Sequence, residues 1–401
     1  MITRLDAALL AQSWADDNAR SAGGEWIAML EEFELGYVVW VKPPDGEQLG
    51  VGSAPRHVID RATGEITTWG SVPAEIVADQ YRHHRQAHPA AAPTVDPVAT
   101  IRRQATRSMA PAIAMHLMLG HDRRLRIAYG AKGDQELNHH PLVREWLDAQ
   151  PSGHLCRGAE RHAEMIAISD VLHAYDVTIG QTTTLEQAQR LFRNPIEFAP
   201  MRVRPGQRSQ VTALPCYSCA AILVHLDLFR PQLLQRMGHR MLLMTALDRP
   251  DFPAELRHLE PPPNLYTEYV SARTGEVVRD PLPQKVESAP AAVQEIARRY
   301  INAGHEGSCT GQVHRVDSLW IRPGMPIFQE LADEFGRAMS LTTAAIGVEN
   351  GGEGVVVADE HGRVFMLDQA GEWFLGADID EAMVTLFLGR EQRRIRDDGT
   401  W

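Results

Sequence analysis

Two short motifs, 54 residues apart, restrict the folds open to this chain more than any other feature. HAE at 162–164 opens one predicted helix, and PCYSC at 215–219 opens another. Cys216 and Cys219 are three residues apart, so at a helix start both sulfurs lie on one face. The positive end of the helix favours thiolates, the form of cysteine that binds metals. A proline directly before the first cysteine suits a helix start, because its missing N–H would be unsatisfied there. A fold in which the two helix starts meet would hold a metal ion between His162, Cys216 and Cys219.

This ligand set is typical of zinc. One neutral imidazole and two thiolates leave a fourth tetrahedral position for water, as catalytic zinc sites do. Zinc lowers the pKa of a water in that position to about 7. Glu164 stands two residues after His162 and is placed to take the proton of that water and pass it on. We therefore expect one Zn²⁺ per chain, with Glu164 as the catalytic residue.

Two other interpretations of the motifs remain open at this point. A structural zinc site would require a fourth protein ligand, which Cys156 or His154 would provide. A redox CxxC pair is less favoured, because no strand ending in Trp-Cys precedes a helix here. Both motif halves occur in order at predicted helix starts, and this favours the catalytic zinc site.

The order H-x-E followed by P-C-x-x-C is the signature of zinc-dependent nucleobase deaminases. The surrounding block resembles the YwqJ-like branch of the bacterial deaminase superfamily, whose cytidine-deaminase-like fold is a three-layer domain with helices flanking a sheet. The resemblance implies hydrolytic deamination of a cyclic amidine such as cytosine, with zinc on His162, Cys216 and Cys219. It also implies that Glu164 shuttles protons and that the Ala163 N–H faces the substrate carbonyl. Many members are toxin modules, but here the block is central and not C-terminal.

Two further groups of residues are candidates for substrate contact. Asn138 lies in the loop after the first predicted strands, a loop that often lines the pocket in this fold, and we assign it to substrate binding. His139 and His140 follow it, and for them a solvated loop is the commoner explanation. Alternating arginines before the PCYSC motif would contact phosphate or lie on an exposed strand face: Arg202, Arg204 and Arg208.

The pattern along the chain predicts an α/β protein in which a central deaminase-like domain, 100–283, lies between two α+β domains. Helix, strand, helix, strand and helix follow one another in the centre, which is typical of layered α/β domains. We expect its first helix over 101–119, interrupted near Pro111. An Ala/Pro-rich linker at 89–99 precedes it.

The two flanking domains have different patterns. Residues 1–88 combine helical periodicity with alternating strands and a hairpin that turns at Thr63-Gly64. Residues 36–69 resemble the YrhB-type immunity family. The last domain, 290–401, contains a hairpin that turns at 359–362 and ends in an amphipathic helix. Its segment 345–390 is similar to SUKH-type immunity domains. These resemblances imply a toxin or effector protein as partner.

Charge is distributed unevenly between these parts. The chain carries −12 in total, but residues 101–240 hold 18 Lys+Arg and 12 Asp+Glu, a balance of +6 against −18 elsewhere. The overall charge argues against general nucleic-acid binding, whereas the basic centre favours a polyanion. Aromatic residues, at 6%, are few for a single-strand stacking surface. The deaminase resemblance implies a base as substrate, in single-stranded nucleic acid or in a free nucleotide or nucleoside, and the basic centre favours a nucleic-acid or nucleotide base. The acidic flanks would neutralise or occlude the centre.

A non-catalytic function remains as the alternative of a different class. The chain would then be a zinc-containing binding or immunity protein that uses the deaminase fold as a scaffold. Glu164 counts against it, because a structural zinc site needs no such carboxylate. Four cysteines are too few for a disulfide framework, and no apolar run or leader pattern indicates a membrane or secretion. We expect a cytoplasmic protein with no membrane partner.

Overall fold

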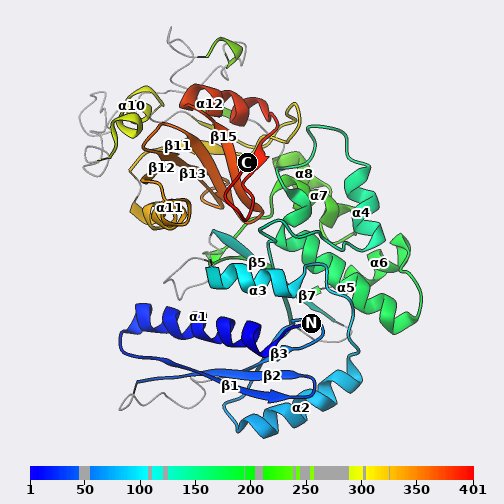
Figure 1. Cartoon of the computed structure of the whole chain (residues 1–401). Helices are drawn as coiled ribbons and strands as arrows, with labels where there is room; N and C mark the ends of the chain where they lie inside the picture. The colour runs from blue at the N-terminus through cyan, green and yellow to red at the C-terminus, as the bar shows by residue number, and fades with distance from the viewer. Residues whose placement is uncertain are drawn as a thin grey trace, which may run out of the picture.

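The computed structural model describes residues 1–44, 55–106, 111–120, 125–193, 195–203, 211–237, 241–243, 253–256, 289–300, 304–324 and 326–401. In this part of the chain the strands form three antiparallel sheets with helices packed on them, which confirms the predicted α/β class (Figure 1). No helix among the described residues is both long and apolar enough to cross a membrane.

The N-terminal sheet is a four-stranded meander between two helices. On one face of the sheet Val39 packs with α1. On the other face Val38 and Val58 pack with α2. This division follows from the alternation of side chains along a strand. The hairpin predicted at Thr63-Gly64 is confirmed by the pairing of Ile59 with Ile66. The elements are α1 (Arg4–Ala22), β1 (Ile27–Phe33), β2 (Gly36–Lys42), β3 (Arg56–Asp60), β4 (Ile66–Trp69) and α2 (Ala74–Ala87).

The central sheet has the strand order β6-β5-β7-β8. Its middle strand β5 shares a core with α5 and α7, the two helices that begin at the motifs, through Met115, Ile168 and Ile222. The strands are β5 (Ala112–Leu119), β6 (Leu125–Tyr129), β7 (Pro195–Val203) and β8 (Val211–Thr212). The helices are α4 (Pro141–Asp148), the 3₁₀ turn η1 (Ala159–Arg161), α5 (Ala163–Ile179), α6 (Leu185–Phe192), α7 (Tyr217–His225) and α8 (Gln232–Met237).

The helix predicted over 101–119 is wrong in its second half. Helix α3 (Pro97–Thr106) ends early, and β5 occupies 112–119 between β6 and β7. The run AIAMHLML is almost wholly buried, so it lacks the polar stripe of a surface helix. A continuous apolar run of this length is equally compatible with a central strand.

The predicted linker contacts both neighbouring parts. The Thr94 N–H donates to the Asp170 carboxylate at 2.8 Å, and Val95 pairs with Leu137 in the centre. Val98, at the start of α3, instead packs against the core under α1. The segment is therefore anchored at both ends, and the domain bounds given above remain a proposal.

The C-terminal sheet has eight described strands, in the order β16-β15-β14-β13-β12-β11-β10-β9. Helices α10 and α12 cover one face and α11 covers the other, so all six residues of β13 are buried. Its edge strand β9 (Met241–Leu243) comes from the segment that we assigned to the centre. The predicted hairpin at 359–362 is confirmed, with Ala358 paired to Val364. The other elements are the 3₁₀ turn η2 (Ala254–Leu256), α10 (Ala291–Tyr300), β10 (Gly304–Glu306), β11 (Leu319–Ile321), α11 (Pro326–Met339), β12 (Thr343–Glu349), β13 (Gly354–Asp359), β14 (Val364–Asp368), β15 (Gly371–Gly376), α12 (Ile379–Leu388) and β16 (Arg393–Arg394).

Candidate metal centre

Both sequence motifs lie at helix N-termini. His162 is the N-cap residue of α5, and Cys216 is the N-cap residue of α7. The Cys216 sulfur accepts the N–H of Cys219 at 3.5 Å, so the thiol itself caps the helix. Pro215 lies directly before the cap residue. The two helix starts therefore point their first side chains towards one place.

The side chains of His162, Cys216 and Cys219 converge. The Nδ1 atom of His162 lies 3.3 Å from the Cys216 sulfur and 3.4 Å from the Cys219 sulfur. The three ligand atoms lie within 4.8 Å of one another, and all three side chains are buried. In a tetrahedral zinc site, bond lengths of about 2.0–2.3 Å separate a nitrogen from a sulfur ligand by about 3.5 Å. The arrangement fits that geometry.

A backbone carbonyl orients the histidine. The Nε2 atom of His162 lies 3.2 Å from the carbonyl oxygen of Arg157. A ring N–H that donates to such a carbonyl leaves the other nitrogen, Nδ1, as the metal ligand. Arg157 therefore takes part in positioning a proposed ligand, although its side chain points elsewhere.

The thiols and the adjacent carboxylate of the cluster would need a positive charge nearby if they were all ionised. Burial raises the pKa of the Cys219 thiol, and the adjacent Glu164 carboxylate raises it further. Buried thiolates beside a carboxylate need a compensating positive charge, which Zn²⁺ would provide.

Glu164 adjoins the three side chains without belonging to their group. It is the second residue of α5, it is 1% exposed, and its Oε2 atom lies 3.3 Å from the Cys219 sulfur. A second carboxyl group is near, because burial and then the charge of Glu164 raise the pKa of Glu353 to about 8. Two carboxyl groups therefore lie at this cluster, and Glu164 is the one in contact with a cysteine sulfur.

Cys156 is buried beside the cluster, whereas His154 is exposed. A hydrogen bond with Cys216, together with burial, raises the pKa of the Cys156 thiol. Its N–H donates to the Ser218 hydroxyl at 2.7 Å. Among the described residues, the group of mutually close ligand atoms includes neither Cys156 nor His154.

This geometry predicts one zinc ion per chain on three protein ligands. Metal analysis of the full chain should give a ratio of one, and X-ray absorption should show two sulfur and two lighter scatterers. Cys156→Ser should retain the metal, because the Cys156 sulfur does not belong to the group of three ligand atoms that lie within 4.8 Å of one another. Three sulfur scatterers in the wild type, or loss of zinc from Cys156→Ser, would make the site structural.

The cavity beside the cluster is shared between the centre and the C-terminal part. Cys156, Arg157, His162 and Cys216 line one side, and residues of the C-terminal sheet and its loops, such as Glu353, line the other. It leaves about 30 Å³ for water, which is room for one or two molecules.

The loop at 138–140 lies apart from this cavity. Asn138 is exposed, its N–H donates to Thr94, and its carbonyl oxygen accepts from His173. Its role in substrate binding stays a prediction. The solvated-loop interpretation of the two histidines is wrong, because both are buried. His139 lies 2.7 Å from the Glu160 carbonyl oxygen, and His140 caps α4.

Sequence reasoning missed the residues that the C-terminal part contributes. The Ala163 N–H donates to Oε1 of Gln369 at 3.0 Å, across 206 residues of sequence. Arg202, considered for phosphate contact, instead pairs with Glu353 at 3.6 Å; Arg204 and Arg208 lie outside the described residues. The only signal of these contacts in the sequence was the charge difference between the centre and its flanks.

Three family models match successive segments of the chain. Residues 6–88 match the model of the immunity protein 35-like domain, residues 97–228 that of the YwqJ-like deaminase, and residues 281–389 that of the SUKH-3 immunity protein. No curated protein and no solved structure matches the chain significantly. The chain thus carries a YwqJ-like deaminase segment between an immunity protein 35-like segment and a SUKH-3 immunity segment.

Proposed function

We propose that this chain is a zinc-dependent hydrolytic deaminase that acts on a nucleobase. The supporting observation is the buried convergence of His162, Cys216 and Cys219 at two helix starts, inside the segment that matches YwqJ-like deaminases. When bound there, zinc would supply a water molecule whose pKa lies near 7. The proposed reaction replaces the exocyclic amine of a cyclic amidine, such as C4 of cytosine, by a carbonyl oxygen.

Three groups of the chain move the proton, orient the substrate and orient the histidine. Glu164 accepts the proton of the attacking water and delivers it to the ring nitrogen and then to the leaving ammonia. The Ala163 N–H, at the start of α5, donates to the substrate carbonyl and sets the orientation of the ring. The Arg157 carbonyl keeps His162 in the tautomer that leaves Nδ1 free.

The charge of the central segment supports the choice of substrate class. The central segment has an excess of basic residues, which favours a phosphate-bearing substrate. We propose cytosine-type bases in single-stranded nucleic acid or in nucleotides and nucleosides. Free thiols at all four cysteines suit a reducing compartment, and we propose the cytoplasm.

One observation favours a second function. Two immunity-type segments flank the centre, and one of them reaches over the metal centre. A non-catalytic zinc protein that binds a toxin or effector protein through these segments would have the same architecture. Such a protein has no use for Glu164 next to the ligands, so the enzyme remains the first proposal.

Ammonia release tests the proposal. Zinc-loaded full chain and its Gln369→Ala variant should be incubated with cytosine, cytidine, CMP, single-stranded DNA and single-stranded RNA, with adenine analogues as controls. We expect release from a cytosine-containing substrate, abolished by Glu164→Ala. Zinc binding without release from any substrate would contradict deamination and favour the binding protein.

A further inference from the structure

The C-terminal part places a carboxamide on the predicted substrate-binding N–H. Gln369 lies in the turn between β14 and β15 and is 6% exposed, and its Oε1 atom accepts the Ala163 N–H at 3.0 Å. Ala163 stands between the proposed ligand His162 and the proposed shuttle Glu164. A carboxamide oxygen next to nitrogen has the same acceptor chemistry as the ring carbonyl of a pyrimidine.

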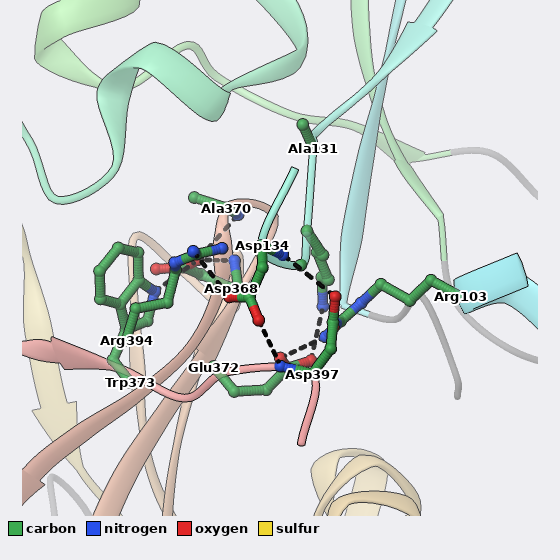
Figure 2. A network of polar contacts seen from close by, with 12 residues as sticks. Arg103, Ala131, Asp134, Asp368, Ala370, Glu372, Trp373, Arg394 and Asp397 are labelled. Carbon is green, nitrogen blue, oxygen red and sulfur yellow. Dashed lines mark hydrogen bonds and ion pairs between the residues drawn. The ribbon is translucent and has the colours of Figure 1, made fainter. Parts of the chain in front are cut away.

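The turn that carries Gln369 is rigid. Oδ1 of Asp368 accepts the N–H groups of Ala370 at 2.8 Å and Gly371 at 3.0 Å, and the indole N–H of Trp373 at 3.1 Å (Figure 2). An aspartate that accepts backbone N–H groups two and three residues ahead stabilises a tight turn. Gln369 is therefore held in its position before any contact with the centre is made, which reduces the entropy lost on docking.

The central surface is shaped to receive this turn. A Cβ atom at Gly130 would lie 2.4 Å from the Gln369 carbonyl oxygen, and one at Gly158 would lie 2.7 Å from the Ala370 side chain. Both glycines therefore permit an approach that any larger residue would block. Gly158 lies only four residues before His162, so the turn contacts the segment that positions the metal ligand.

Arg157 connects the metal centre with the C-terminal part. Its guanidinium is buried and donates to Asp368 at 2.9 Å, to Glu349 at 2.6 Å and to Gln392 at 2.9 Å. All three acceptors belong to the C-terminal part, while its own carbonyl oxygen orients His162. Removing one member of such a buried charged group is strongly unfavourable, whereas separating the two surfaces would return both charges to water.

A second group of ion pairs joins β15, β16 and the residues after β16 to α3 and the loop after β6 (Figure 2). Arg103 pairs with Glu372 and Asp397. Asp134 accepts from Arg394 at 2.9 Å and from the Asp397 N–H at 3.0 Å. Asp134 and Asp397 are about half exposed, and exposed pairs contribute little each. They therefore suit a contact that opens and closes.

These contacts give the charge split of the chain a structural meaning. The basic side chains Arg103, Arg157 and Arg202 come from the positive centre, and their partners come from the acidic C-terminal part. While they are paired, they are not available to the phosphates of a substrate. A polyanion and the C-terminal part would therefore compete for the same surface.

We propose that the SUKH-3-like C-terminal segment is an intramolecular inhibitor of the metal centre, and that its Gln369 carboxamide occupies the place of the substrate carbonyl. The proposal rests on the proposed function and adds its regulation. Activity then requires release of this segment, for example when a partner protein binds it. Charge screening alone would not need Gln369, so the contact with Ala163 distinguishes the two mechanisms.

The test uses the full chain and readouts that do not depend on turnover. Gln369→Ala removes the acceptor of the Ala163 N–H. Hydrogen exchange at Ala163 and extraction of zinc by 1,10-phenanthroline should each become about tenfold faster, the loss expected for one buried hydrogen bond. The matched control is Gln329→Ala, which removes a carboxamide that also accepts a backbone N–H, that of Ala345, remote from the centre. It should change neither rate.

A second variant guards against a local folding effect of Gln369→Ala. The double variant Asp134→Ala/Asp397→Ala weakens docking without touching the turn. Its control is Asp398→Ala, which removes an acceptor of the Thr400 N–H and hydroxyl within its own loop. Faster exchange and extraction in the double variant but not in the control support the inhibitor. Rates within twofold of wild type in both Gln369→Ala and the double variant overturn it, even if ammonia is released. Faster rates without ammonia release from any substrate leave the closure standing and refute the deaminase.

Discussion

Glu164→Ala should lower the rate of ammonia release by about 10²–10⁴-fold, the range that general acid–base catalysis contributes. Zinc content should stay at one per chain, because Glu164 adjoins the cluster of His162, Cys216 and Cys219 without belonging to it. The fold should also persist, since a neutral side chain replaces a buried carboxylate with no ion pair among the described residues. The measurement is kcat for the best substrate of the panel, in zinc-loaded protein and in the Gln369→Ala background.

A matched control is four residues away. Glu160 is an exposed glutamate in η1 that faces Arg161 at 3.5 Å, and Glu160→Ala should keep kcat within about twofold, as surface changes usually do. Turnover of Glu164→Ala close to that of the wild type would mean that another group moves the proton. Glu353 would then be the next candidate, because it lines the cavity beside the cluster.

Cys216→Ser should produce the largest loss of stability among single substitutions. Cys216 is both a proposed ligand and the N-cap of α7, and it lies in the central core. Binding of zinc to three residues from two helix starts is also folding free energy, with about 10–16 kcal/mol measured for structural zinc in small peptides. We expect a loss of about 3–5 kcal/mol for the central part, the range for breaking a buried charged group.

Thermal unfolding with and without a chelator measures this effect. Chelator should lower the Tm of the wild type towards that of Cys216→Ser, and it should leave Cys216→Ser unchanged. Cys309→Ser, at a half-buried cysteine outside the cluster, should behave as the wild type does. Equal Tm values for Cys216→Ser and the wild type would show that no metal stabilises this fold.

The local parts of the fold were predictable from the sequence because local patterns determine them. The spacing of Cys216 and Cys219 needs a single helical turn to bring both sulfurs to one side. The hairpins at 63–64 and 359–362 combine a turn-forming glycine with alternating strands on either side. Each of these predictions depends on fewer than about twenty neighbouring residues, and the interactions that decide it lie within that stretch.

The error at 112–119 has a related cause. An apolar run without periodicity fits a buried strand or a buried helix equally well. The segment forms a strand because β6 and β7 supply hydrogen-bond partners on both of its edges. Burial of His139 and His140 was likewise decided by packing and not by the polarity of their loop.

The sequence by itself determined which side chains have zinc-ligand chemistry and that each motif opens a helix. Only the tertiary structure decided that the C-terminal part lies over them. Gln369 and Ala163 are 206 residues apart, and Arg157 and Asp368 are 211 apart. No local pattern specifies such pairs, because they depend on the docking of two separately formed cores. The uneven charge indicated that the centre and its flanks attract each other. Which turn fits the central surface depends on the close approach that Gly130 and Gly158 permit.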